Sequence, residues 1–516
     1  MSGIVLNAFP QALPNDELVF KVSKSLNEFG FDADSTLLAT SLCCDEVNRP
    51  LEKDLRKAFG GRNFSMGGLS GFPFGGITSF GAMAHHIPKG GSCLVVFGPH
   101  VGIDSEGNIG VVNRRGRSTP GACCGSACAA LHHFQSGHGK PAPEAFADPA
   151  DYQQAMVVKL LEPHAKTLTK ASEPMKELPH CLFQAMQKVM EQIVAIACQE
   201  VHGGKIALLG GIQINTPSHM SDFFLPLTFD VRSNQNIKIA DLLSFPELST
   251  PTLTAFSNAS GVLTSTPESA AVMDKLVKKA FPKAVTNAGL VAKVATNLQD
   301  HGFTQEGTLL ATSLCCDEVC RNLEFDLRTK YDSNFSMGGL AGFAFGGVTS
   351  FGAMAHHIPK DGNCLIVYGP HVGIDAEGNV GVVNRRGRSA PSTCCGSACA
   401  ALKHLQTECP LPSLEELCDP AVSQQAMVVK MLEPYSKALA NMGTPMKHLP
   451  MCLFEAQQKL MDQIVEAGCQ QVHGGKIALL GGIQINTPYS EEDYFFPLTF
   501  EVRNNANEKI ADLCEC

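Results

Sequence analysis

Cysteine and histidine stand in this sequence at the ends of predicted regular elements. Cys43 follows an apolar run, His100 follows a second apolar run in a Gly-Pro-His segment, and Cys124 opens a segment rich in small residues. Two thiolates and one imidazole supply three ligands to a zinc ion, and a catalytic zinc keeps a fourth position open for water. These residues are far apart in the chain, unlike a compact zinc knuckle, so buried thiols remain an alternative.

The same three residue types occur a second time because the chain is a tandem duplication. LLATSLCCDEV begins at Leu37 and again at Leu309, and other long segments recur in the same order. The second set of candidate ligands is Cys315, His371 and Cys395. The period is far longer than that of a solenoid repeat, so each copy is a whole domain.

We predict one domain over residues 1–243 and a second over residues 271–516. The segment between them, 244–270, is rich in Ser, Thr and Pro and is typical of an exposed linker. A chain of 516 residues is long enough for two such domains.

Helices and strands alternate within each copy, which predicts an α/β domain around a central sheet. In the first copy, apolar runs predict strands at 35–43, 92–103, 107–113 and 204–217, and helical periodicity covers 16–30, 45–59, 123–134 and 175–200. Pro50 fits the third helical segment only if it lies in the first turn. The candidate ligands follow or precede these elements, where functional loops gather in α/β folds.

Composition excludes several classes of protein. Hydrophobic residues make up 44% and charged residues 17%, which is typical of a globular chain, and the net charge of −10 does not predict nucleic-acid binding. No apolar run is long enough to span a bilayer. The 21 cysteines are better explained by reduced thiols and metal sites than by a disulfide framework. Residues 1–13 lack the pattern of a signal or transit peptide, so either the protein is cytoplasmic or a targeting segment has been removed.

The motifs CCDEV, SFGAMAHHIP, GPHVGID, NRRGR and CCGSA together resemble the LCIB family, the limiting-CO2-inducible B-type proteins or theta-class carbonic anhydrases of algae and diatoms. The resemblance covers most of both copies. It implies that each copy has a fold like that of beta-class carbonic anhydrases, with a central, mostly parallel sheet flanked by helices. It also implies reversible hydration of CO2 to bicarbonate, in inorganic carbon acquisition.

The resemblance implies one Zn²⁺ per copy, two per chain. The implied ligands are Cys43, His100 and Cys124 in the first copy and Cys315, His371 and Cys395 in the second. The choice within each pair of adjacent cysteines stays open at this point. The implied substrates are CO2 and bicarbonate, and the implied location is the chloroplast. The two copies are expected to form an intramolecular pseudo-dimer, alone or within a larger homo-oligomer.

A catalytic aspartate with an arginine partner is also implied. The aspartate corresponds to Asp45 in the first copy and to Asp317 in the second. Beta-class enzymes place the arginine two residues after the aspartate, where this chain has valine. Helical spacing favours Arg56 and Arg328 as partners, with Arg49 as an alternative, and a surface role remains open for each.

Histidines and phenylalanines near the motifs have two interpretations each. His86 and His357 are the candidate proton shuttles by family position, although a structural, hydrogen-bonded histidine fits equally well. Phe72 and Phe74 either line a CO2 pocket or pack the core. The NRRGR motif, with Arg114, Arg115 and Arg117, is interpreted as a solvated basic turn, with bicarbonate binding or contact with another subunit as the alternatives.

Two other functions remain as alternatives. The chain could be a zinc-containing CO2 or bicarbonate sensor or scaffold of the same family without hydration activity. A thiol redox protein that uses Cys43–Cys44 or Cys123–Cys124 is less favoured, because adjacent cysteines form strained disulfides and no thioredoxin-type motif is present.

Overall fold

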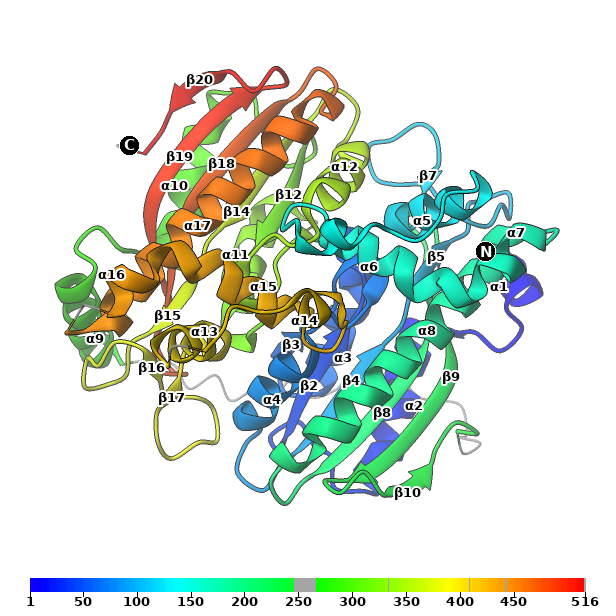
Figure 1. The fold of residues 1–516 in the computed structure, drawn as a ribbon, viewed down its shortest axis with the longest axis horizontal. Coiled ribbons are helices and arrows are strands. Elements are labelled where there is room, and N and C mark those ends of the chain that lie inside the picture. Colours follow the sequence, from blue (N-terminus) through cyan, green and yellow to red (C-terminus); the bar gives the residue numbers. More distant parts are fainter. Residues whose placement is uncertain (246–265, 333, 408, 441–442, 515–516) are drawn as a thin grey trace. The chain divides into compact units, whose positions relative to one another are not determined.

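The computed structural model describes the chain except residues 246–265, 333, 408, 441–442 and 515–516 (Figure 1). The predicted linker at 244–270 therefore lies mostly outside the described residues. A helix already begins at Pro267, before the predicted start of the second copy.

Each copy is built on one eight-stranded sheet. In the first, the strand order is β1-β9-β8-β4-β2-β3, with β10 also paired to β9 and β5 also paired to β8. Its strands are β1 (Leu13–Pro14), β2 (Thr36–Ser41), β3 (Asn63–Ser65), β4 (Ser92–Phe97), β5 (His100–Gly102), β8 (Lys205–Asn215), β9 (Phe223–Ser233) and β10 (Lys238–Asp241), and a separate two-stranded sheet is formed by β6 (Val111–Val112) and β7 (Gly121–Ala122), as it is by β16 and β17 in the second copy. The strands β3, β2, β4, β5 and β8 pair in parallel, and β9 runs antiparallel to β8.

The second copy repeats this topology, with the order β11-β19-β18-β14-β12-β13. Its strands are β11 (Val285–Thr286), β12 (Thr308–Ser313), β13 (Asn334–Ser336), β14 (Asn363–Tyr368), β15 (His371–Gly373), β16 (Val382–Val383), β17 (Ser392–Thr393), β18 (Lys476–Asn486), β19 (Tyr494–Asn504) and β20 (Lys509–Asp512). The predicted α/β fold with a mostly parallel central sheet in each copy is confirmed.

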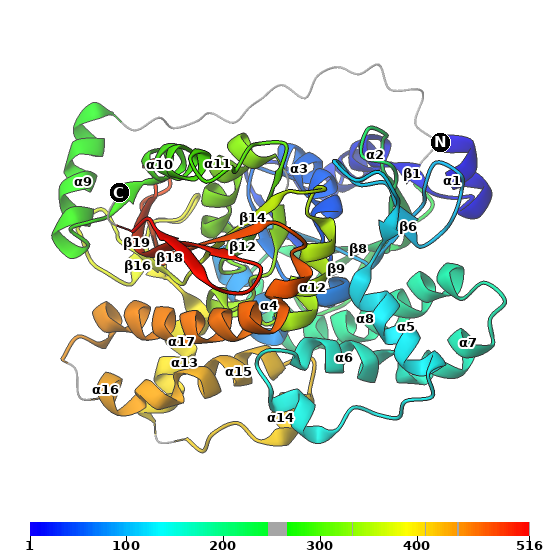
Figure 2. The ribbon, with the colours of Figure 1, turned by 90° about the horizontal axis from the view of Figure 1, so that it is seen from above.

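Helices cover both faces of each sheet, as Figure 2 shows for α10 and α11 on one side and α17 on the other. The helices of the first copy are α1 (Ser2–Ala8), α2 (Asn15–Asn27), α3 (Arg49–Ala58), α4 (Gly76–His86), α5 (Gly125–Gln135), α6 (Tyr152–Leu161), α7 (Ala165–Lys170) and α8 (Pro174–Ala197). Those that follow are α9 (Pro267–Ala280), α10 (Asn287–Gln299), α11 (Arg321–Tyr331), α12 (Gly347–His357), α13 (Gly396–Gln406), α14 (Leu414–Cys418), α15 (Ser423–Leu432), α16 (Ser436–Ala440) and α17 (Pro445–Gly468).

Side chains along β4 point alternately to the two faces of the sheet, and an apolar layer lies on each face. Val96 lies in the core formed with α2 and α3, whereas its neighbour Phe97 points to the other face and stacks on Phe183 of α8, with ring centroids 5.9 Å apart. Successive strand residues point to opposite faces, so a strand covered on both sides is apolar throughout. This is why β2, β4 and β8 appear in the sequence as uninterrupted apolar runs.

Two expected elements differ from the structure. The strand predicted over 92–103 is two strands, β4 and β5, separated by Gly98 and Pro99. The segment predicted as one helix over 45–59 begins with a short 3-10 turn at Glu46–Asn48, and α3 starts at Arg49. Pro50 lies in the first turn of α3, where its missing N–H leaves no intrahelical hydrogen bond unmade.

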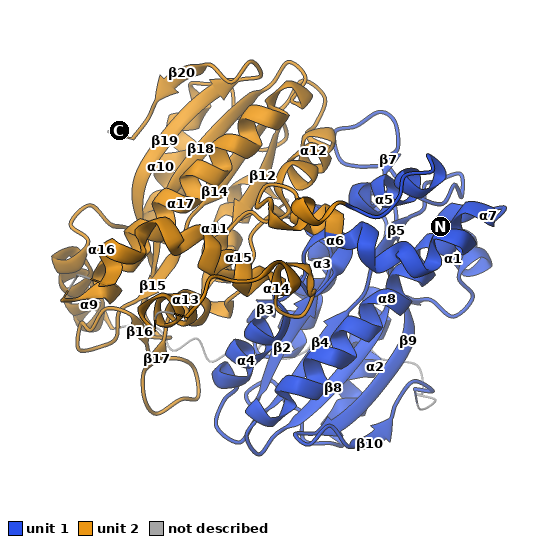
Figure 3. Ribbon diagram, viewed as in Figure 1, with its two compact units in different colours: residues 1–141, 156–262 blue, residues 142–155, 263–516 orange. Residues whose placement is uncertain are grey.

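The chain divides into two compact units (Figure 3). Unit 1 comprises residues 1–141 and 156–262, and unit 2 comprises residues 142–155 and 263–516. This division differs from the predicted boundaries because residues 142–155 of the first copy belong to unit 2. Within unit 2, Thr349 Oγ1 donates a hydrogen bond of 2.8 Å to Asp151 Oδ1.

Candidate metal centre

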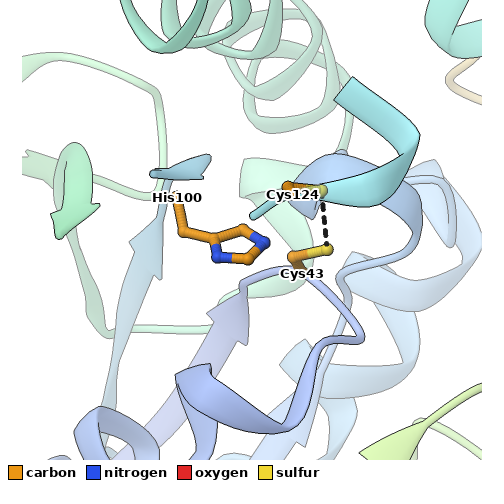
Figure 4. Close-up of side chains that lie close together, drawn as sticks. All are labelled: Cys43, His100 and Cys124. Atoms are coloured by element: carbon orange, nitrogen blue, oxygen red, sulfur yellow. Dashed lines mark hydrogen bonds between the residues drawn. The ribbon is translucent and has the colours of Figure 1, made fainter. Parts of the chain in front are cut away.

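Three buried side chains converge in the first copy: Cys43, His100 and Cys124 (Figure 4). Their potential ligand atoms all lie within 4.8 Å of one another, and the sulfurs of Cys43 and Cys124 are 3.5 Å apart. Figure 4 shows one ring nitrogen of His100 directed toward the two sulfurs. The structure thus brings together three residues that are widely separated in the sequence.

Each of the three side chains is positioned by the end of a regular element. Cys43 follows the buried strand β2, His100 is the first residue of β5, and Cys124 is the N-cap residue of α5. β2 and β4 are parallel, and Ser41 at the end of β2 pairs with Phe97 at the end of β4. Cys43 and His100, which follow these two strands, therefore lie at the same carboxyl edge of the sheet.

Close backbone approach at Gly98 lets β5 turn toward this edge. A Cβ atom at Gly98 would lie only 1.9 Å from the backbone oxygen of Gly211 in β8. The β8–β9 register shifts between Gly210 and Gly211. Glycine at position 98 is therefore required for the path that delivers His100 to the site.

The His100 ring is oriented by Asn215, the last residue of β8. Nδ1 of His100 lies 2.8 Å from Oδ1 of Asn215, so Nδ1 carries the proton that is donated to this oxygen. That tautomer leaves a lone pair on Nε2, which is buried and has no hydrogen-bond partner among the described residues. A buried nitrogen with an unused lone pair, beside two sulfurs, is suited to bind a metal ion.

The geometry distinguishes the members of each cysteine pair. Cys43 and Cys124 form the group with His100 that includes two sulfurs. Cys123 instead lies on the Nδ1 side of the ring, with its sulfur 3.3 Å from that atom. The sulfur of Cys44 is 3.9 Å from that of Cys43.

Burial controls the protonation of these groups when no cation is bound. Burial raises the pKa of the Cys43 thiol, and the hydrogen bond to Cys43 together with burial raises the pKa of Cys124 well above its usual value. Burial alone would lower the pKa of His100, but the neighbouring cysteines raise it well above its usual value. A bound divalent cation reverses this situation, because it deprotonates coordinating thiols.

Asp45 lies beside the cluster and is paired with Arg114. Nη2 of Arg114 donates a 2.9 Å hydrogen bond to Oδ2 of Asp45, and Nε donates a 3.1 Å hydrogen bond to Glu46. Asp45 Oδ2 is 3.9 Å from Nε2 of His100. All three charged groups are strongly shielded from solvent, and the contact with the guanidinium fixes the orientation of the aspartate.

This arrangement corrects the prediction that Arg56 is the partner of Asp45. Arg56 lies in the last turn of α3, is half-buried, and donates from Nε to the backbone oxygen of Gly61 at 2.9 Å. The alternative, Arg49, is buried but donates to the backbone oxygen of Cys43 at 2.6 Å and pairs with Glu52. Arg49 thus supports the loop that carries the ligand, and neither arginine takes the place of Arg114.

The second copy has the same centre. The sulfurs of Cys315 and Cys395 are 3.6 Å apart, and Nδ1 of His371 lies 2.8 Å from Asn486 Oδ1. Nε2 of His371 is also buried without a hydrogen-bond partner among the residues that the structure covers.

Asp317 of the second copy is paired in the same way. Arg385 binds both carboxylate oxygens of Asp317, each at 2.9 Å. Arg328, the predicted partner, is half-buried and donates from Nε to the backbone oxygen of Asp332.

His86 lies away from the cluster. The helix α4 starts after β3 and leads back to the beginning of β4, so its last residue, His86, lies near the amino edge of the parallel strands. Ten residues of helix span about 15 Å. The His86 ring packs on Phe64, with centroids 5.8 Å apart, and His357 packs on Phe335 at 5.7 Å. This placement does not support the predicted proton transfer by His86 or His357.

Arg114 and Asn215 are the site residues that sequence reasoning missed. Arg114 is the first arginine of NRRGR, and this motif was interpreted as a solvated turn. Asn215 ends the recurring segment GKIALLGGIQIN, which was interpreted only as a core strand. The sequence did contain a signal for both residues, because each recurs in the two copies, Asn215 at the end of an apolar strand and Arg114 beside one.

Phe72 and Phe74, the proposed pocket wall, are fully buried and stack with centroids 5.5 Å apart.

Known proteins resemble this chain in both halves. The family model for limiting CO2-inducible proteins B/C beta carbonic anhydrases matches residues 12–233 and 284–504. The crystal structure of PtLCIB4, a homolog of the limiting CO2-inducible protein LCIB, is 48% identical and covers 47% of this chain and 99% of its own, with a TM-score of 0.44. That of LCIB is 22% identical and covers 45% of this chain and 95% of its own, with a TM-score of 0.36. No curated protein matches the chain.

Proposed function

The chain belongs to the family of limiting CO2-inducible proteins B/C beta carbonic anhydrases, and on this premise we propose that it is a zinc-dependent carbonic anhydrase. The reaction is CO2 plus water to bicarbonate plus a proton, in both directions. Its proposed role is inorganic carbon acquisition, with one centre in each copy.

The observation that carries the proposal is the buried lone pair of His100, next to two thiols and an arginine-paired aspartate. A structural zinc site is normally closed by four protein ligands, whereas a catalytic site has three and an open position. Cys43, His100 and Cys124 supply three ligands. The Arg114 ion pair engages Asp45 and so opposes its use as a fourth ligand.

The residues present fit zinc. Two sulfurs that are each about 2.3 Å from a tetrahedral zinc lie roughly 3.8 Å apart, close to the 3.5 Å and 3.6 Å separations of the two copies. Thiolate and imidazole are donors that zinc prefers. When bound, zinc lowers the pKa of water to about 7 and so supplies a nucleophile at neutral pH.

The protein's own groups have separate roles in this proposal. Asp45 accepts a hydrogen bond from the attacking water and directs its lone pair toward CO2. Arg114 orients Asp45, and Asn215 keeps the His100 proton on Nδ1. Asp317, Arg385 and Asn486 have the same roles in the second copy. These are positioning effects, which preorganise a site before the reaction.

Ligand substitution tests the proposal. We expect wild-type protein to contain two zinc ions per chain, His100→Ala or His371→Ala to contain one, and the double variant to contain none. Hydration measured by stopped flow should fall in the same steps, to background in the double variant.

The matched control is the pair His133→Ala and His404→Ala, because these half-buried histidines also recur in both copies and each contacts a backbone oxygen, that of Gly139 or Pro410, through Nε2. Zinc content and hydration should stay at wild-type values in this control. If wild type retains two zincs and hydrates no CO2, the proposal is overturned in favour of a zinc-containing sensor or scaffold.

A further inference from the structure

A second group of metal-binding side chains lies in unit 1, at the edge of the sheet opposite to Cys43. It consists of His85, Glu200 and His202, whose potential ligand atoms all lie within 4.8 Å of one another. His85 belongs to the last turn of α4, and the other two residues precede β8. Because α4 leads away from the carboxyl edge, this group is separate from the proposed zinc centre.

A tight turn brings Glu200 and His202 together. Glu200 ends the 3-10 helix Cys198–Glu200, and the backbone N–H of His202 donates to the backbone oxygen of Glu200 at 3.0 Å. The intervening Val201 is buried, which fixes the turn against the domain. The side chains on either side of it are therefore presented to solvent next to the end of α4.

The carboxylate of Glu200 is directed toward the histidines. Its Oε2 lies 3.4 Å from Nε2 of His85, and the rings of His85 and His202 have centroids 6.3 Å apart. For metal–ligand bonds of about 2.0–2.2 Å, tetrahedral ligand atoms are roughly 3.3–3.6 Å apart. The His85–Glu200 distance is already within this range, and exposed side chains adjust readily to complete the set.

The second copy provides a natural comparison. It retains both histidines, as His356 and His473, but has Gln471 in place of Glu200. The Gln471 amide lies against helix α12, since a Cβ at Gly352 would be 2.8 Å from its Oε1. In the first copy, the equivalent Gly81 has nothing within 4 Å. The Glu200 side chain therefore does not pack over Gly81 of α4 and lies near the His85 imidazole instead.

We propose that His85, Glu200 and His202 form a binding site for a divalent transition-metal ion of the zinc class. Two imidazoles and one carboxylate are borderline donors that suit Zn²⁺, Co²⁺ or Ni²⁺ and disfavour Mg²⁺ or Ca²⁺. Water completes the coordination, because the site is exposed. The bound ion joins the end of α4 to the turn before β8, and only the first copy has it.

Cobalt titration tests this site, with tag-free protein that carries two zinc ions per chain, one in each cysteine–histidine centre, and that has been dialysed so that the exposed site is empty. We expect one Co²⁺ per chain to bind and give d–d absorption without thiolate charge-transfer bands, since no cysteine is a ligand. Glu200→Gln should weaken this binding by at least tenfold, because loss of supporting groups alone costs roughly 10–100-fold in metal affinity. Gln471 occupies the equivalent position in the second copy, so the variant is expected to fold.

The matched pair His202→Ala and His473→Ala locates the site. Loss of Co²⁺ binding in His202→Ala with full binding in His473→Ala supports the proposal. The proposal is overturned if wild type binds no Co²⁺, if Glu200→Gln binds it as wild type does, or if thiolate bands accompany binding. The first of these outcomes would reduce the group to an ion pair between Glu200 and protonated His85. None of these readouts depends on CO2 hydration.

Discussion

The ion pair between Arg114 and Asp45 is the main electrostatic interaction around the proposed zinc centre of the first copy. Arg385 and Asp317 form the equivalent pair in the second copy. Burial alone would lower the pKa of Arg114, but the charges of Asp45 and Glu46 raise it above the ordinary value. The guanidinium is therefore charged at any pH at which the protein is folded. A permanent positive charge next to a buried carboxylate favours the ionised aspartate.

Removal of this charge should lower activity while zinc remains bound. In the double variant Arg114→Gln and Arg385→Gln, we expect CO2 hydration to fall roughly 10–100-fold, as is typical when support of a metal site is lost. Stopped-flow rates normalised to zinc content measure the effect.

The control for this prediction is the pair Arg56→Gln and Arg328→Gln, at half-buried arginines that contact loop backbone. These variants should hydrate CO2 at the wild-type rate. A larger loss in the control than in the Arg114 variant would show that the site was assigned to the wrong arginine.

The sequence pointed more directly to the candidate ligands than to the residues around them. Cys43, His100 and Cys124 were identifiable because each has a chemically distinctive side chain at the end of an element. The Asp45–Arg114 contact joins residues that are 69 positions apart. Helical spacing could only suggest arginines on the same helix, and tertiary pairing of this kind leaves no local periodicity.

At the scale of elements, the buried strands were predictable and the antiparallel strand β9 was not. β9 has the sequence FFLPLTFDVRS, and a proline normally argues against a central strand. Here Pro226 lies opposite Gly211, where the register between β8 and β9 shifts. A bulge locally interrupts the ladder of hydrogen bonds, so the missing N–H of proline is tolerated.

Gly98 is the position at which a substitution should most disturb the path of the chain from β4 to β5. Gly98→Ala would force a Cβ atom against the Gly211 oxygen, and overpacking of this kind costs about 1–3 kcal/mol. We expect a lower urea midpoint for unfolding and weaker zinc binding in the first copy, because His100 follows directly.

Gly81→Ala is the control for this prediction. Gly81 lies inside α4 with open space around it, and alanine is favoured over glycine within helices by roughly 0.5–1 kcal/mol. Unfolding of this variant should shift to higher urea. Equal midpoints for Gly98→Ala and wild type would show that the close approach at Gly98 does not constrain the chain.

At the scale of the whole molecule, the duplication itself was evident from the sequence. Both copies retain the three candidate ligands, the aspartate, the arginine and the asparagine. The division into units was less predictable. Residues 142–155 belong to unit 2, and nothing in the sequence indicates that this segment of the first copy packs with the other unit. None of the described helices is long and apolar enough to cross a membrane.

The two proposed centres have the same candidate ligands but different neighbours. Ser70, whose hydroxyl oxygen is 3.8 Å from the sulfur of Cys124, is replaced by Ala341 in the second copy. Asn48 is replaced by Cys320. Because neighbouring groups tune a metal site, the two centres are expected to differ in rate while both remain active.

The most direct test of zinc-dependent hydration is stopped-flow measurement on protein shown to contain two zinc ions per chain, before and after removal of zinc by a strong chelator and again after zinc is restored. We predict fast hydration that falls to background on chelation and returns when zinc is restored. Protein that carries both zinc ions and hydrates CO2 no faster than buffer would contradict the account.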